Sequence, residues 1–174
     1  ESEIVQNVFH RLHNCGYGVG LHPSFGSWQS EETMSTEKIR LERAIERKVT
    51  KVRQHYLRYE PGRTWTLQEE LGFETDSTIQ FTEGLGFAAG ICTPYNLYDL
   101  HGRRMMQLEE HPLILMKKKD YVKDVEKQYS SYVALLNEAK KHNGRFQILF
   151  HNSDVETDNE KKLFEATLSF LADR

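Results

Sequence analysis

The 174-residue chain lacks long apolar runs, a recognisable targeting signal and a cysteine framework. No stretch reaches the roughly 18 apolar residues that a membrane-spanning helix needs, so we expect no membrane span. The opening residues, Glu-Ser-Glu-Ile, lack the basic-then-apolar pattern of a secretory signal and are typical of a helix within something longer, which leaves the compartment open. Cys15 and Cys92 show neither Cys-x-x-Cys nor zinc-ribbon spacing, and we interpret them as structural or free thiols.

The chain also lacks the charge pattern of a nucleic-acid-binding protein. Its net charge is −3, and no basic stripe is interleaved with aromatic residues. The one dense basic run, residues 117–119, lies at an element boundary and is typical of a solvated loop. We find no internal repeat and no low-complexity linker. The length suits a single domain with a substantial core, and we expect no nucleic acid among its partners.

What the sequence does contain is an alternation of helical and extended patterns. Helices are predicted to begin near residues 4, 30, 66, 120 (with Asp120 as cap) and 158 (with Asp158 as cap). Strands are predicted over residues 17–22, 49–56, 73–76, 87–92, 107–116 and 145–150, with Pro112 placing the fifth at an edge or bulge. This order favours an α/β fold with about five or six mainly parallel strands and outer helices, arranged as a sheet or an incomplete (β/α) barrel.

Polar side chains follow several of these predicted strands. In parallel α/β folds, sites form at the carboxyl ends of strands. That rule selects His22, Arg53, His55, Asp76, and His151 with Asn152 and Asp154. The other histidines, which lie within helices or on uncertain segments, we interpret as structural or surface residues: His10, His13, His101, His111 and His142. His10 and His13 have metal-capable spacing, but no third ligand is near them in sequence.

At these same places the sequence resembles the polysaccharide deacetylase family, the carbohydrate esterases of family four. The likeness is greatest to a bacterial subgroup and rests on Gly-Leu-His-Pro-Ser at residues 20–24 and Arg-Gln-His-Tyr-Leu at 53–57. It continues with Gly-Phe-Ala-Ala-Gly-Ile-Cys-Thr-Pro at 86–94 and Leu-Phe-His-Asn at 149–152. Each motif is short, but together they occur in the family's order over roughly residues 17–152.

The resemblance implies a distorted barrel with a divalent metal, most simply zinc, and removal of N- or O-acetyl groups from a polysaccharide or amino sugar. It implies that His22 is a metal ligand and that Arg53 pairs with the catalytic aspartate. His151 would be the general acid, and Asp76, a looser match, the carboxylate that orients it. The resemblance also implies a bacterial protein of carbohydrate metabolism that is either cytoplasmic or associated with the cell envelope.

Departures from the family pattern qualify this expectation. The motif that holds the base and metal aspartates is missing, so we expect a single domain over residues 1–174 without its first strand. Gly26 stands where the second metal histidine would fall, and either Ser24 or, better, His55 would substitute. Ala88 occupies a place where the subgroup often has arginine. An unpaired sheet edge would favour pairing with a second copy, so a homo-oligomer is one expected arrangement.

Two other functions compete with an impaired, metal-dependent deacetylase. The first is a non-catalytic relative that binds a glycan, the expected partner, through Trp28, Tyr95 and Tyr98 on loops. The second is an α/β scaffold that serves assembly of a surface-polysaccharide locus. Metal binding and turnover distinguish the enzyme from both.

Overall fold

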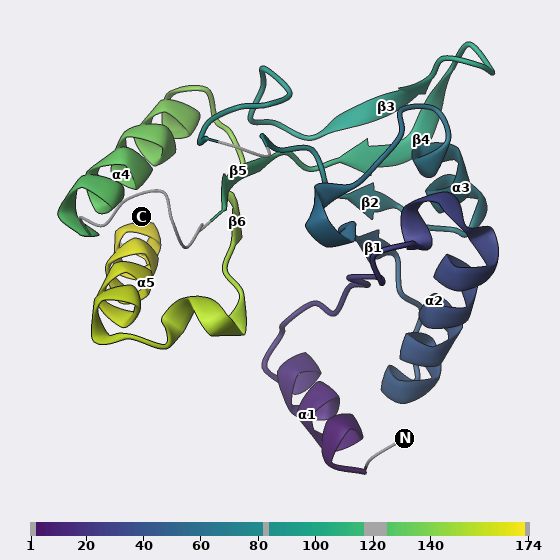
Figure 1. Cartoon of the computed structure of the whole chain (residues 1–174), viewed down its shortest axis with the longest axis horizontal. Helices are drawn as coiled ribbons and strands as arrows, with labels where there is room; N and C mark the ends of the chain where they lie inside the picture. The colour runs from purple at the N-terminus through teal and green to yellow at the C-terminus, as the bar shows by residue number, and fades with distance from the viewer. Residues whose placement is uncertain (1–2, 82–83, 117–124, 173–174) are drawn as a thin grey trace. The chain divides into compact units, whose positions relative to one another are not determined.

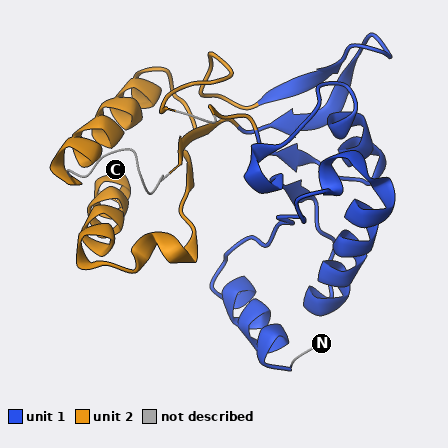
Figure 2. Cartoon of the chain, viewed as in Figure 1, with its two compact units in different colours: residues 1–78, 95–111 blue, residues 79–94, 112–174 orange. Residues whose placement is uncertain are grey.

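The computed structural model describes residues 3–81, 84–116 and 125–172. The chain divides into two compact units (Figure 2): unit 1 comprises residues 1–78 and 95–111, and unit 2 comprises residues 79–94 and 112–174. Each unit has strands and helices of its own. The expectation of one domain over residues 1–174 stays a prediction.

Unit 1 is built on a four-stranded sheet with the order β1-β2-β4-β3 (Figure 1). The pairs β1–β2 and β2–β4 are parallel, whereas β3 and β4 form an antiparallel hairpin. The elements of this unit are α1 (Glu3–Asn14), η1 (Ser27–Gln29), α2 (Glu31–Ile45), β1 (Lys51–Val52), η2 (His55–Leu57), α3 (Thr64–Glu70), β2 (Thr75–Asp76), β3 (Tyr95–Asp99) and β4 (Arg104–Glu110).

The core of unit 1 follows from the spacing of its apolar residues. In β4 the buried positions alternate, so that Met106 and Leu108 face the core. Helix α2 starts where Ser30 Oγ accepts a hydrogen bond from the Thr33 N–H at 3.2 Å, and it buries Met34 completely. Burial of each such side chain contributes about 1.5–3 kcal/mol, which is enough to hold short strands in register.

The strand predicted over residues 17–22 is reduced to one parallel bridge between Leu21 and Val52. The Leu21 N–H donates to the Lys51 carbonyl at 2.8 Å, and the Arg53 N–H donates to the Leu21 carbonyl at 3.0 Å. This segment therefore continues the parallel arrangement of β1, β2 and β4. Its carboxyl end lies at the same edge of the sheet as theirs.

Unit 2 contains a two-stranded parallel sheet and two long helices. Its elements are β5 (Leu113–Met116), α4 (Val125–Lys141), β6 (Gln147–Leu149), η3 (Asn152–Val155) and α5 (Asp158–Ala172). Leu115, Tyr132 and Leu163 form one buried cluster, and Cys92, Ile114 and Ala139 form another. The basic run 117–119 and the predicted cap Asp120 lie outside the described residues.

Three local predictions were wrong. Residues 87–92 form turns rather than a strand, because Gly90 adopts φ 72° and Cys92 packs into the core. The single strand predicted over residues 107–116 is instead two strands in different units, separated at His111 and Pro112. The cap of α5 is Thr157, whose Oγ1 accepts the Glu160 N–H at 3.3 Å, and not Asp158.

The prediction of a mixed α/β fold with mostly parallel strands is confirmed. Neither sheet closes on itself within the part of the chain that the structure describes, so a barrel is not seen there. Among the same residues, no helix has the length and apolar character to cross a membrane. Cys15 is an exposed free thiol and Cys92 a buried one.

Candidate functional site

The carboxyl edge of the sheet in unit 1 gathers polar side chains from four neighbouring segments. His22 follows the bridge at Leu21, and Arg53 follows β1. Asp76 and Glu110 are the last residues of β2 and β4 and are register neighbours. Neither carboxyl side chain is exposed, with 0 % relative accessibility for both residues. The strand-end rule thus brings three predicted site residues to one edge, together with a fourth that it missed.

His22 is held in a defined tautomer by its neighbour on the sheet. Its Nδ1 lies 2.7 Å from the Arg53 carbonyl oxygen. Because a carbonyl oxygen only accepts hydrogen bonds, the proton of this contact belongs to Nδ1. In the neutral imidazole the lone pair then lies on Nε2. This is the arrangement in which protein carbonyls orient metal-binding histidines.

His55 lies beside His22, with ring centroids 5.0 Å apart and an interplanar angle of 72°. The two imidazoles could supply two nitrogen ligands to a metal, whereas a zinc site takes three or four protein ligands. No group of three or more His, Cys, Asp or Glu side chains suited to a metal occurs among the described residues. The residues that the structure describes therefore do not form a complete zinc site.

Arg53 links the imidazole edge to the carboxyl groups. Its Nε donates to the carbonyl and to the Oγ of Ser77, both at 3.0 Å. Burial lowers the pKa of the Arg53 guanidinium, and the negative charges of Asp76 and Glu110 oppose that shift. Arg53 is thus a partly buried cation that interacts with two carboxyl groups.

The two carboxylate oxygens of Asp76 differ in their hydrogen bonds to the described residues. Its Oδ1 accepts hydrogen bonds from the Ser77 N–H at 2.8 Å and from the Thr78 hydroxyl at 2.5 Å. Its Oδ2 is buried and has no hydrogen-bond partner among the described residues. Burial raises the pKa of Asp76 to about 6, although these hydrogen bonds, Arg53 and the nearby Gln68 lower it. The Gln68 contact is weak, because the buried amide of Gln68 makes no hydrogen bond of ordinary geometry.

Glu110 is the functional candidate that sequence reasoning missed. The sequence signal was that Met106, Leu108 and Glu110 stand at every second position and are followed directly by His-Pro; the structure buries all three. Reading residues 107–116 as one strand placed Glu110 in its middle rather than at an end. The strand ends at this residue, so the carboxyl group belongs to the same edge as Asp76.

The three predicted sugar-binding aromatic residues occupy different environments, and two of them were wrongly placed on loops. Tyr95 and Tyr98 lie on β3, where Tyr98 is 44 % exposed. Burial, followed by the charge of Glu110, raises the pKa of Tyr95 to about 12, so this hydroxyl belongs to the carboxyl cluster. Trp28 lies in η1, with the Arg58 guanidinium 5.0 Å from its ring centroid.

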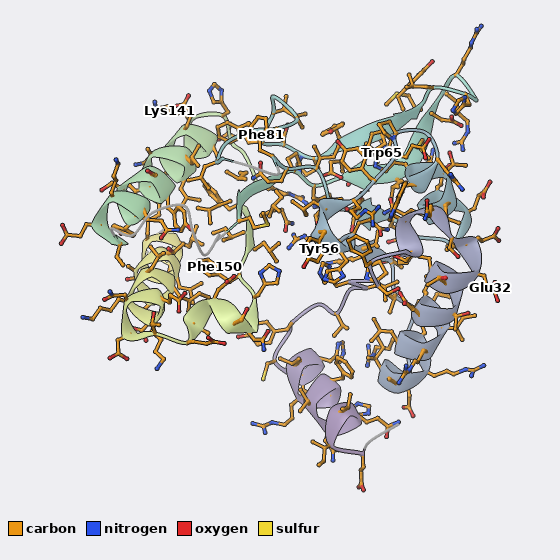
Figure 3. The ribbon with its side chains drawn as sticks, viewed as in Figure 1. Glu32, Tyr56, Trp65, Phe81, Lys141 and Phe150 are labelled. Atoms are coloured by element: carbon orange, nitrogen blue, oxygen red, sulfur yellow. The ribbon has the colours of Figure 1, made fainter. Side chains whose placement is uncertain are left out.

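A row of exposed aromatic rings continues from the imidazole pair. Tyr56 contacts His55 at 4.8 Å and Phe25 at 5.5 Å between ring centroids, and Arg58 lies 4.0 Å from the Phe25 ring. Tyr56, labelled in Figure 3, is 71 % exposed and adopts the left-handed conformation with φ 57°. That conformation costs an L-residue about 1–2 kcal/mol. An exposed aromatic ring held at such a cost is a feature that often marks function.

A cleft of about 800 Å³ opens next to His22 and His55 within unit 1. Its walls are mainly apolar and include Val5 and Phe9 of α1. Polar groups from His22, Ser24, Glu37, Arg40 and His55 border it. A ligand in this cleft would meet both apolar surface and hydrogen-bonding groups.

His151 lies in unit 2, at the entry to η3 after β6. Its Nδ1 is 3.1 Å from the Oδ2 of Asp154, and its backbone N–H donates to the same oxygen at 2.7 Å. Because a carboxylate accepts, Nδ1 is the donor in this contact. The carboxylate that orients His151 within its unit is therefore Asp154, three residues further along the chain. Asp76, to which sequence reasoning gave that role, lies in unit 1.

No protein-family model and no curated protein matches the sequence. Among solved structures, the chain matches one from Mycobacterium smegmatis whose own assignment as a polysaccharide deacetylase is provisional. The TM-score is 0.70 at 16 % sequence identity, over 95 % of this chain and 60 % of that one. The chain thus spans less than two thirds of the length of its structural neighbour, and at this identity the likeness shows a shared fold.

Proposed function

We propose that this protein is a hydrolase of the polysaccharide deacetylase type, which removes acetyl groups from a polysaccharide or amino sugar. The observation that carries the proposal is the fold match to the mycobacterial structure over 95 % of the chain. The gathering of His22, Arg53 and Asp76 at one sheet edge supports it. In this proposal the described strands are part of a larger barrel-like sheet.

In the proposed reaction His151 is the general acid. Its Nδ1 donates to Asp154, which would stabilise the imidazolium form and leave Nε2 to deliver a proton to the departing amine or alcohol. Asp154 thereby acts as a positioning residue. Within unit 1, Arg53 and Asp76 would supply fixed charges at the carboxyl edge of the sheet.

The proposal includes a divalent metal, most simply zinc, but the described residues supply only two of its ligands. His22 and His55 would contribute nitrogen ligands, and a bound metal would polarise the acetyl carbonyl. Two imidazoles do not complete a zinc site, so no step assigned above passes through a metal.

A non-catalytic glycan-binding protein is the second candidate. The missing third ligand among the described residues and the exposed row of Phe25 and Tyr56 favour it. Aromatic rings stack on the apolar faces of sugars without any need for turnover.

Calorimetric titration of the chain with Zn²⁺ and with Ni²⁺, paired with an acetate-release assay on acetylated xylan and N-acetylated chitohexaose, separates the candidates. The hydrolase predicts saturable metal binding that His22→Ala weakens at least tenfold and that His101→Ala, a control on the β3–β4 hairpin, leaves unchanged. Glycan binding without acetate release would favour the second candidate. Absence of site-specific metal binding would overturn the metal-dependent hydrolase.

A further inference from the structure

Two buried carboxyl groups stand side by side at the edge of the unit 1 sheet. Asp76 and Glu110 are paired in register across the parallel strands β2 and β4. Register neighbours point to the same face of a sheet, and adjacent strands are about 4.8 Å apart. Both residues are fully buried, at 0 % accessibility. Their carboxyl groups therefore share one small, dry environment.

Among the described residues, the groups that interact with this pair include one cation and several neutral side chains. Arg53, after β1, is the cation that interacts with both carboxyls. Tyr59, after η2, and Tyr95, on β3, also interact with both, and each contributes a neutral phenol whose pKa burial raises. Gln68 of α3 contributes a neutral amide. His111, the next residue after β4, has its Nε2 3.2 Å from Glu109 instead.

Two ionised carboxylates on adjacent strands and out of water repel each other strongly. Aspartic acid pairs in other proteins relieve such repulsion by holding one proton between two carboxyls. Asp76 has the geometry for this. Its Oδ1 is occupied by two donors, whereas its Oδ2 has no hydrogen-bond partner among the described residues. A proton on Oδ2 would turn that buried acceptor into a donor.

We propose that Asp76 and Glu110 form a buried carboxyl pair that holds one proton, with Oδ2 of Asp76 as its principal site. Glu110 is then a positioning residue that fixes the charge state of Asp76 opposite Arg53. When the proton leaves, the edge that carries His22 gains one negative charge. The charge of this edge does not depend on whether the protein deacetylates a carbohydrate.

Nuclear magnetic resonance of the full chain tests the pair directly. The ¹³C carboxyl shifts of labelled Asp and Glu are followed from about pH 3 to pH 9, a range that spans ordinary and strongly raised carboxyl values. Asp76→Asn and Glu110→Gln identify the two signals by their disappearance. A shared proton predicts that Glu110→Gln lowers the titration midpoint of Asp76 by about one pH unit or more. Glu110→Asp should keep the midpoint raised, because the charge is retained.

Glu109→Gln is the matched control, since the neighbouring Glu109 side chain is 47 % exposed and pairs with His111. It should leave the midpoint of Asp76 unchanged. Should Glu110→Gln fail to fold, the reciprocal measurement decides: the midpoint of Glu110 must fall in Asp76→Asn. The proposal would be overturned if the Asp76 midpoint stayed the same in Glu110→Gln, or if the Glu110 midpoint stayed the same in Asp76→Asn. Either result would show that burial alone raises the midpoint of the group that was followed.

Discussion

Replacing Asp76 by Asn should change the pH dependence of stability in a defined direction. Asn retains an oxygen that can accept the hydrogen bonds of Ser77 and Thr78, but it cannot ionise. In the wild type, burial raises the pKa of Asp76 from 3.8 to about 6. The folded state therefore binds this proton more tightly than the unfolded state does. The stability contributed by Asp76 is full below about pH 4 and is lost as the pH rises through about 6.

The magnitude follows from the shift. From 3.8 to about 6 is about two pKa units, and each unit corresponds to about 1.4 kcal/mol, which gives about 3 kcal/mol for this fully buried group. The free energy of unfolding of Asp76→Asn minus that of the wild type should thus rise by about 3 kcal/mol between about pH 3.5 and pH 7.5. Taking the difference removes the contributions of carboxyl groups whose titration the substitution does not change.

Urea denaturation followed by tryptophan fluorescence is the suitable assay. Both tryptophans, Trp28 and Trp65, lie in unit 1 together with Asp76, so the signal reports on the relevant unit. Asp99→Asn serves as a control of opposite sign. Backbone N–H groups of Gly102 and His101, together with Arg104, lower the pKa of Asp99, so its contribution is lost as the pH falls. A difference between Asp76→Asn and wild type that stays flat with pH would refute the reasoning.

Three further predictions concern the rest of the molecule. Asp154→Ala should reduce acetate release by tenfold or more and shift its pH profile, whereas His142→Ala, an exposed control in the same unit, should not; an unchanged profile would remove Asp154 from its positioning role. Gly144→Ala should destabilise unit 2 by about 1–3 kcal/mol in a thermal melt, because a Cβ there would lie 2.5 Å from Cys92 Sγ. Tyr56→Gly should be more stable to urea than Tyr56→Ala by about 1 kcal/mol, the reverse of the usual order, since φ is 57°.

Sequence reasoning located the unit 1 edge because polar residues follow short segments that contain strand-forming apolar residues. Val49 and Val52 precede Arg53, whereas the weaker segment that ends at Asp76 has Phe73 as its apolar residue. The same reasoning lost Glu110, because the apolar residues on both sides of His111 and Pro112 read as one continuous strand. Strand length is poorly determined by local pattern when the chain passes from one compact unit to another.

Other features of the site have no sequence signature that local rules detect. Tyr56 and Leu57 adopt left-handed conformations that are typical of glycine, so nothing in their identity predicts that the Tyr56 ring points outward. The apolar run at residues 87–92 has the composition of a buried strand, yet the backbone turns at Gly90, which adopts φ 72°, and Cys92 packs against Ile114 and Ala139. By contrast, the strand-end rule did select both His151 and Asp154, although it did not predict the hydrogen bond between them.

Acetate release by the full chain from acetylated xylan and N-acetylated chitohexaose, with and without added Zn²⁺, tests the proposed hydrolase most directly. We predict acetate release that His22→Ala and His151→Ala each reduce at least tenfold and that His101→Ala and His142→Ala leave unchanged. Release that is the same in all four variants, or glycan binding with no release under any condition, would contradict it.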